Sequence, residues 1–451
     1  MTNNLRLFVN HAMTLLLMLA AQSAYAILPI EHWQTTAGAK VYFVANRSLP
    51  MIDVSVEFPA GSSFDTLEKS GVAAMTNSML RLGANGLSEG DIARSLADVG
   101  AVLSGSFDAD GAGLSLRTLS DGPRRSQALG ILTQVLTAPE FPAEVLDREK
   151  VQQIGALREA DLKPDTQASR MFYQLVYGQH PYALRSTGEV VSLGSMKRDD
   201  LVSFYRRHYV AERAVVAIMG DLSRVDAEAL AEQLTRGLPH AGNATLVLPR
   251  VTPLEHAIMR IVKHPAAQSH ILIGAPGISR NDPDYFTLYV GNHILGGGGF
   301  VSRITNEVRQ KRGFAYSAYS YFSPQKLRGP FIIGMQTRRD QANEALKVVR
   351  QTLRDFVSNG PTEQELLAAK QNIVGGFPMR IDSNRKIHGY LSVIGFYGLP
   401  LSYLEDFVGN IERVTVADIK AAFARRVDPD KLVTVVVGAD QDQTTPARVA
   451  R

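Results

Sequence analysis

Three positions on one predicted helix have the spacing of a metal-binding motif without its residue types. Ala74, Asn77 and Ser78 lie in residues 71–80, at the spacing at which an H-x-x-E-H sequence places two zinc ligands and a catalytic base. Residues three and four positions apart share one face of a helix, so these side chains are expected to face the same space. None of them can replace imidazole as a zinc ligand. The sequence therefore predicts the frame of a metal site without its chemistry.

A second group of residues could bind a polypeptide. Arg309 lies near the end of a predicted helix, and Tyr316 lies at the start of the next strand, across Gly313. This layout can direct a guanidinium and a phenol to one cavity, and both groups donate hydrogen bonds to peptide carbonyls. The alternative for Arg309 is a structural ion pair.

A run of four glycines precedes that helix: Gly296, Gly297, Gly298 and Gly299. Glycines expose backbone N–H groups and permit close approach of another chain. The alternative is a flexible connection between two helices. The run is not a P-loop, because no Lys-Ser or Lys-Thr follows it.

Other catalytic arrangements have little support in the sequence. The chain has ten histidines, and the closest pair, His264 and His270, is too far apart for a helical i, i+4 metal site. There is no G-x-S-x-G elbow, and the absence of cysteine excludes a thiolate metal site and a cysteine nucleophile. We therefore expect no cofactor in this chain.

Composition indicates a large globular protein of more than one domain. The chain has 451 residues, of which 45% are hydrophobic and 20% are charged. At about 100–200 residues per domain, two to four domains are expected. The net charge is only +4, and no run of Lys and Arg exceeds two residues, so nucleic-acid binding is not expected.

The N-terminus has the pattern of a signal peptide. Arg6 precedes an apolar run over residues 12–21, and Ala24-Tyr25-Ala26 provides a small-x-small cleavage site. We expect residues 1–26 to be removed and the mature protein to be periplasmic; an uncleaved anchor is the alternative. No stretch of the length needed for a stable membrane span is found.

An internal repeat organises the rest of the chain. Similar strands, each leading to similar helices, recur at an offset of roughly 215–220 residues. The strand pairs are 51–58 with 269–275, 113–119 with 330–337, and 214–219 with 432–437. The helix pairs are 68–82 with 282–295, 122–138 with 340–358, and 142–160 with 362–375. The alternative is that two unrelated α+β domains share similar turn residues between their strands and helices by chance.

The repeat predicts an α+β fold of two homologous halves, each a mostly antiparallel sheet covered by helices. We place an N-terminal domain at 27–245, a C-terminal domain at 246–445 and a tail at 446–451. Pro and Gly residues mark a linker at about 239–254.

Together these features resemble the pitrilysin/insulinase family of inverzincin metallopeptidases, within its bacterial, processing-peptidase-like branch. The resemblance covers nearly the whole mature chain and rests on residues 59–63, 71–80, 178–182, 296–303 and 308–316. It implies that each chain forms one half of a clamshell around a chamber. It also implies a third glutamate ligand, whose place falls at Gly155-Ala156, so every metal-site position has lost its chemistry.

The resemblance further implies roles for Arg309 and Tyr316, which match the Arg/Tyr pair of the family. In paired bacterial members one subunit carries zinc and the other carries this pair. The glycine run is shorter than that of the mitochondrial non-catalytic subunit, so recognition of presequences is not expected.

The main hypothesis is a non-catalytic, substrate-binding subunit of an exported zinc-dependent peptidase heterodimer that acts on peptides or unfolded polypeptides. A homologous partner with the zinc motif would supply the metal. The second hypothesis is a stand-alone exported peptide-binding module, monomeric or homodimeric. The third is an active metallopeptidase with an unorthodox site.

Overall fold

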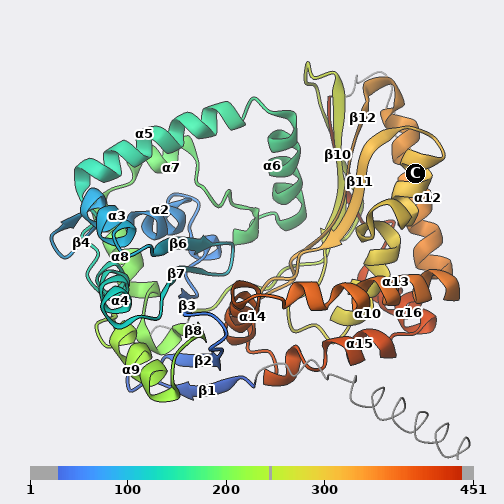
Figure 1. Ribbon diagram of the computed structural model, residues 1–451. Helices are drawn as coiled ribbons and strands as arrows, with labels where there is room; N and C mark the ends of the chain where they lie inside the picture. The colour runs from blue at the N-terminus through green and yellow to red at the C-terminus, as the bar shows by residue number, and fades with distance from the viewer. Residues whose placement is uncertain (1–28, 243–245, 439–451) are drawn as a thin grey trace, which may run out of the picture.

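The protein consists of two α+β halves that lie side by side (Figure 1). The computed structural model describes residues 29–242 and 246–438. The predicted signal peptide and the predicted C-terminal tail lie outside the described residues.

The first half is built on a six-stranded sheet with the order β1-β2-β8-β3-β7-β6. Its strands are β1 (Glu31–Gln34), β2 (Lys40–Ala45), β3 (Met51–Phe58), β6 (Val102–Phe107), β7 (Ala112–Leu119) and β8 (Val215–Gly220). All pairs are antiparallel except β2 with β8. A two-residue hairpin, β4 (Gly83–Ala84) and β5 (Leu87–Ser88), stands apart.

The second half repeats this topology. Its sheet has the order β11-β12-β10-β13-β9, and only β13 and β9 run parallel. The strands are β9 (Ile258–Val262), β10 (Gln268–Pro276), β11 (Ala315–Phe322), β12 (Pro330–Arg338) and β13 (Val433–Val437). Read backwards, the order matches β2-β8-β3-β7-β6 strand for strand, including the parallel pair. The predicted fold of two homologous α+β halves is confirmed.

Helices cover both sheets. Those of the first half are α2 (Val72–Met79), α3 (Glu89–Ala97), α4 (Gly122–Thr137), α5 (Ala143–Ala160), α6 (Pro164–Tyr177), α7 (Val190–Ser195), α8 (Arg198–His208) and α9 (Arg224–Thr235). Those of the second half are α10 (Tyr285–Asn292), α11 (Arg303–Thr305), α12 (Ala342–Asn359), α13 (Glu363–Gly376), α14 (Asn384–Tyr397), α15 (Phe407–Arg413) and α16 (Val416–Arg426). No helix in the described ranges is long and apolar enough to cross a membrane.

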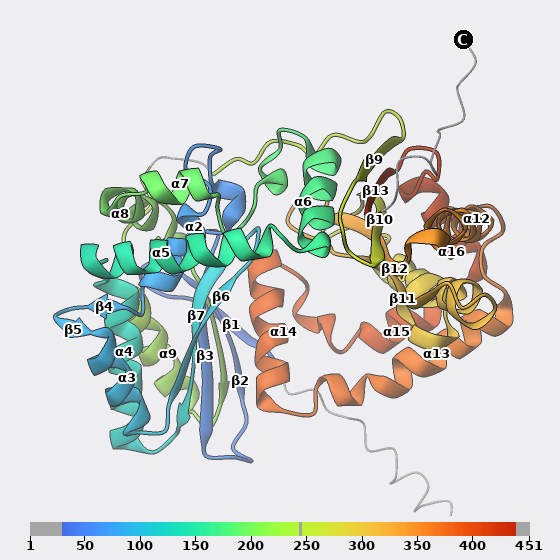
Figure 2. The ribbon, with the colours of Figure 1, turned by 90° about the horizontal axis from the view of Figure 1, so that it is seen from above.

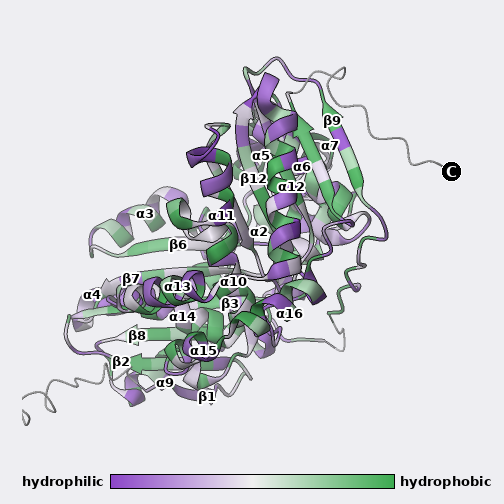
Figure 3. Ribbon diagram, turned by 90° about the vertical axis from the view of Figure 1, so that its right-hand side faces the viewer, coloured by the Kyte–Doolittle hydropathy of each residue, from purple (hydrophilic) through white to green (hydrophobic). Residues whose placement is uncertain are grey.

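The halves exchange one helix each. Helix α6 of the first half packs against β10 and β13 of the second sheet, while α14 of the second half packs against β8, β3 and β2 (Figure 2). Strand β8 is therefore buried along its whole length, which explains its uninterrupted apolar sequence. In Figure 3 many strands carry green segments and many helices alternate between green and purple along their length, as expected for amphipathic helices on a common core.

One buried carboxylate joins the two halves. Asp110, on the β6–β7 turn, is 3% exposed and accepts hydrogen bonds from the hydroxyls of Tyr182 (2.6 Å) and Tyr397 (3.0 Å). The backbone N–H of Lys326 also donates to it, at 2.6 Å. Two of these three donors belong to the second half, so Asp110 fixes the relative position of the halves.

Candidate functional site

Helix α2 carries the positions of the metal-binding motif and is shorter than the predicted helix 68–82. It begins after Gly71, whose φ of 91° is readily adopted only by glycine. The carboxylate of Asp65 caps it by accepting hydrogen bonds from the N–H groups of Gly71 (2.7 Å) and Ala73 (3.0 Å). Burial raises the pKa of Asp65 to about 7, although these two hydrogen bonds oppose the shift.

The motif positions on α2 serve the packing of the first half. Asn77 is buried, and its amide donates to the carbonyl of Gly113 (3.1 Å) and to the hydroxyl of Tyr209 (3.3 Å). Ser78 donates to the carbonyl of Met75 within its own helix. Ala74 has no ligand atom. These residues do not fit a zinc ion.

The predicted position of the third ligand is equally unsuited. Gly155 and Ala156 lie on the exposed face of α5, and neither side chain can coordinate a metal. Across residues 29–242 and 246–438 there is also no group of three His, Cys, Asp or Glu residues that could hold a metal ion.

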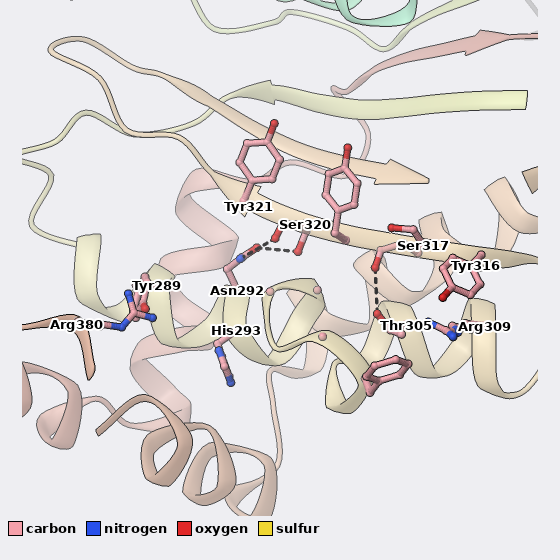
Figure 4. Close-up of a pocket in the computed structure, with 16 residues that line it drawn as sticks. Tyr289, Asn292, His293, Thr305, Arg309, Tyr316, Ser317, Ser320, Tyr321 and Arg380 are labelled. Atoms are coloured by element: carbon pink, nitrogen blue, oxygen red, sulfur yellow. Dashed lines mark hydrogen bonds between the residues drawn. The ribbon is translucent and has the colours of Figure 1, made fainter. Parts of the chain in front are cut away.

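Arg309 and Tyr316 line one cavity of about 610 Å³ in the second half (Figure 4). The guanidinium carbon of Arg309 lies 4.4 Å from the ring centre of Tyr316 and 4.6 Å from that of Phe300. Cation–π contact with two rings holds the guanidinium in place while its N–H donors remain available. The Tyr316 side chain is 81% exposed, so its hydroxyl is accessible to a ligand.

The glycine run forms another wall of this cavity, and the alternative of a flexible connection between two helices is wrong for the first part of the run. Helix α10 continues into a π-helical turn at His293–Gly297, where the predicted helix 282–295 was expected to end. A Cβ atom on Gly296 would lie 2.4 Å from the hydroxyl of Ser320 and 2.5 Å from its backbone nitrogen. The glycine thus allows close approach of the chain's own strand β11. Gly297 and Gly299 line the cavity, and Gly298 donates its N–H to the carbonyl of His293.

A buried hydrogen-bond pair fixes that turn to β11. The amide of Asn292 donates to the carbonyl of Ser320 at 2.9 Å, and the hydroxyl of Ser320 donates to the Asn292 carbonyl oxygen at 2.7 Å. A second π-helical turn, Asn306–Gln310, carries Arg309. Such turns occur frequently at functional sites.

Two arginines supply the charge of the cavity. Its lining includes Arg309 and Arg380 and contains no Asp or Glu. Burial lowers the pKa of His293, so this imidazole is neutral at pH 7, and burial raises the pKa of Tyr321 to about 12, so its phenol remains a donor. The sequence does not mark Arg380 or Phe300 as site residues, because neither belongs to a recognisable motif and Arg380 lies far from Arg309 in the chain.

Known protein families match both halves. The insulinase (peptidase family M16) domain matches residues 40–188, and the peptidase M16 inactive domain matches residues 195–373. A protein of Helicobacter pylori named non-peptidase homolog YmxG is 24% identical over 414 residues, which cover 89% of this chain and 92% of that protein.

Solved structures show the same architecture. The crystal structure of a peptidase M16 inactive domain from Pseudomonas fluorescens is 39% identical and has a TM-score of 0.88, covering 92% of this chain and 98% of that one. The periplasmic protease PqqL from Escherichia coli shares the fold with a TM-score of 0.78 at 15% identity; the match covers 91% of this chain and 46% of that chain. The chain therefore belongs to the insulinase family of peptidases, family M16.

Proposed function

We propose that this protein is the non-catalytic, substrate-binding subunit of an exported, zinc-dependent peptidase heterodimer. Its substrates would be peptides or unfolded polypeptides. A homologous partner subunit with the zinc motif would hold the metal, and this chain would form one wall of the chamber.

One contrast between the halves carries the proposal. In the first half, Asn77 and Ser78 use their polar groups for internal hydrogen bonds. In the second half, Arg309 and Tyr316 line an open cavity. Within the described parts of the chain, their side chains form no ion pair and no hydrogen bond. Buried polar groups satisfied by the protein stabilise the fold, whereas positioned donors without a protein acceptor are available to a ligand.

The chemistry of these two groups suits the backbone of a substrate. Arg309 offers a fork of N–H donors, and Tyr316 offers a hydroxyl, so together they can hold main-chain carbonyls. Donors placed in this way stabilise negative charge that develops on a carbonyl oxygen during amide hydrolysis. The names non-peptidase homolog and inactive domain, given to two relatives, agree with a chain that does not hydrolyse peptides alone.

Co-purification tests this function. The tagged protein, expressed with a homologue that carries the H-x-x-E-H motif, should elute with that homologue in equal amounts and at the mass of a heterodimer. A protein that elutes alone and still binds peptide would contradict the proposal and would favour the stand-alone peptide-binding module.

A further inference from the structure

A second cavity lies where the two halves meet. It has a volume of about 730 Å³, and it shares no lining residue with the Arg309 cavity. Val215, at the start of β8, contributes from the first half, and Phe396, near the end of α14, contributes from the second. Residues 246–248 of the linker form a further wall. The cavity is therefore bounded by both halves and by the segment that joins them.

Apolar side chains that the fold leaves partly exposed form much of the cavity wall. They come from four separate segments of the chain: Phe64, Leu246 with Leu248, Leu327, and Phe396. A ligand that covered these side chains would be stabilised by the apolar area removed from water. Cavities of about 300–1,000 Å³ with mostly apolar walls are typical of sites for small molecules.

Two lysines give this apolar cavity positive charge. Lys40 lies at the start of β2, and Lys326 lies in the loop between β11 and β12. Both side chains are exposed. Within the described parts of the chain, neither ammonium group forms an ion pair or a hydrogen bond. Both can therefore bind an anion without breaking a contact of the protein.

The acidic residues of the lining already have donors. The carboxylate of Asp110 accepts three hydrogen bonds, one of them from the backbone N–H of Lys326. Glu212 accepts a hydrogen bond from the backbone N–H of Ala241 (2.8 Å) and pairs with His240 (3.0 Å). Neither acid pairs with the two ammonium groups, so the charge of the lysines remains available to a ligand.

We propose that this cavity binds one acyl chain with an anionic head, such as a fatty acid. The chain would lie against the apolar walls, and the head would meet Lys40 and Lys326. A neutral apolar molecule would leave both ammonium groups without a partner, and a cation would be repelled. The site is separate from the Arg309 cavity and goes beyond the proposed function. Because it is lined by both halves, its ligand would help to hold them in place.

Calorimetric titration of the purified full chain with octanoate, decanoate and dodecanoate tests the proposal. All three are used below their critical micelle concentrations. Each fully buried methylene contributes about fourfold in affinity, so every two added methylenes should raise the affinity about tenfold. Each fatty acid should saturate at one molecule per chain.

Two further probes test the head group. Decyltrimethylammonium has the chain length of decanoate and the opposite charge, so it should bind at least about tenfold more weakly. Dodecanoyl lysophosphatidylglycerol has the acyl chain of dodecanoate and a lipid head. Tighter binding of this lysolipid than of dodecanoate would assign the site to a membrane lipid, and weaker binding would assign it to a free fatty acid; either result supports the site.

Three variants with the same charge change locate the site. Lys40→Gln and Lys326→Gln should each weaken binding of dodecanoate about threefold, as expected for exposed ion pairs, and the double variant should weaken it about tenfold. Lys263→Gln, at an exposed position outside the cavity lining, should change nothing. Because the exchanged side chains are exposed, all of these variants should fold normally.

An affinity that does not rise with chain length would overturn the proposal. Equal binding of decanoate and decyltrimethylammonium, many bound molecules per chain, or an equal effect of Lys263→Gln would also overturn it. The measurements need no partner subunit, so their outcome is independent of the proposed heterodimer.

Discussion

In the reconstituted heterodimer, Arg309→Ala should lower the rate of peptide hydrolysis by about 10²–10³-fold, the usual effect of removing one donor to a developing oxyanion. Arg309 is held between the rings of Phe300 and Tyr316 and has no carboxylate partner among the described residues, so its loss leaves no buried unpaired charge. The effect should therefore be on the rate of hydrolysis, with little change in the stability of the fold.

Two conservative variants separate donation from positioning. Tyr316→Phe keeps the ring that stacks on Arg309 and removes only the hydroxyl, and it should still slow hydrolysis. Arg309→Lys keeps the charge but loses the planar fork, so it should not restore the rate. Arg385→Ala serves as the control. An unchanged rate in both Arg309→Ala and Tyr316→Phe, with an intact heterodimer, would rule out their role in catalysis.

Asp110→Ala should lower the free energy of unfolding by about 3 kcal/mol or more, because each buried hydrogen-bond donor that loses its acceptor costs about 1–3 kcal/mol. The substitution would remove the acceptor of two tyrosine hydroxyls and one backbone N–H at the junction of the halves. Tyr397→Phe, which removes one donor, should cost about 1 kcal/mol. Denaturation in urea measures both values.

The pH dependence gives a second check on Asp110. Burial is the largest influence on this carboxyl and raises its pKa, so its ionisation in the folded state costs free energy. Its stabilising contribution is complete below the pKa of the unfolded chain and falls as the pH rises through the raised folded value. The difference between the wild-type protein and Asp110→Ala should therefore shrink as the pH rises. The exposed pair of Asp382 with Lys386 is the control: Asp382→Ala should cost less than about 1 kcal/mol. A similar cost for both aspartates would show that Asp110 does not fix the halves.

The repeat made the fold predictable from the sequence. In strands such as 51–58 and 330–337, apolar residues alternate with polar ones or follow one another over a short length between turn residues. The structure places both strands within a residue or two of the predicted bounds. The exchange of α6 and α14 between the halves could not be predicted in this way, because periodicity reports an apolar face and not the sheet that covers it.

The candidate site was predictable where residue types alone decide the chemistry. The unsuitability of Ala74, Asn77 and Ser78 for zinc follows from their functional groups. The π-helical turn at Gly296 could not be predicted from the sequence, because a glycine run permits many conformations and only the close contact with Ser320 selects one. Arg380 and Asp110 act through partners that are distant in the sequence, and no local pattern marks them.

In the proposed heterodimer this chain binds substrate and a partner subunit holds the hydrolytic centre. Zinc content and peptidase activity should be measured on the purified protein alone and on the heterodimer, each after mild chelation. The protein alone should hold no stoichiometric zinc and should cleave no peptide, whereas the heterodimer should hold one zinc and cleave peptides. One tightly held zinc per isolated chain, with peptide cleavage that a strong chelator abolishes, would contradict it.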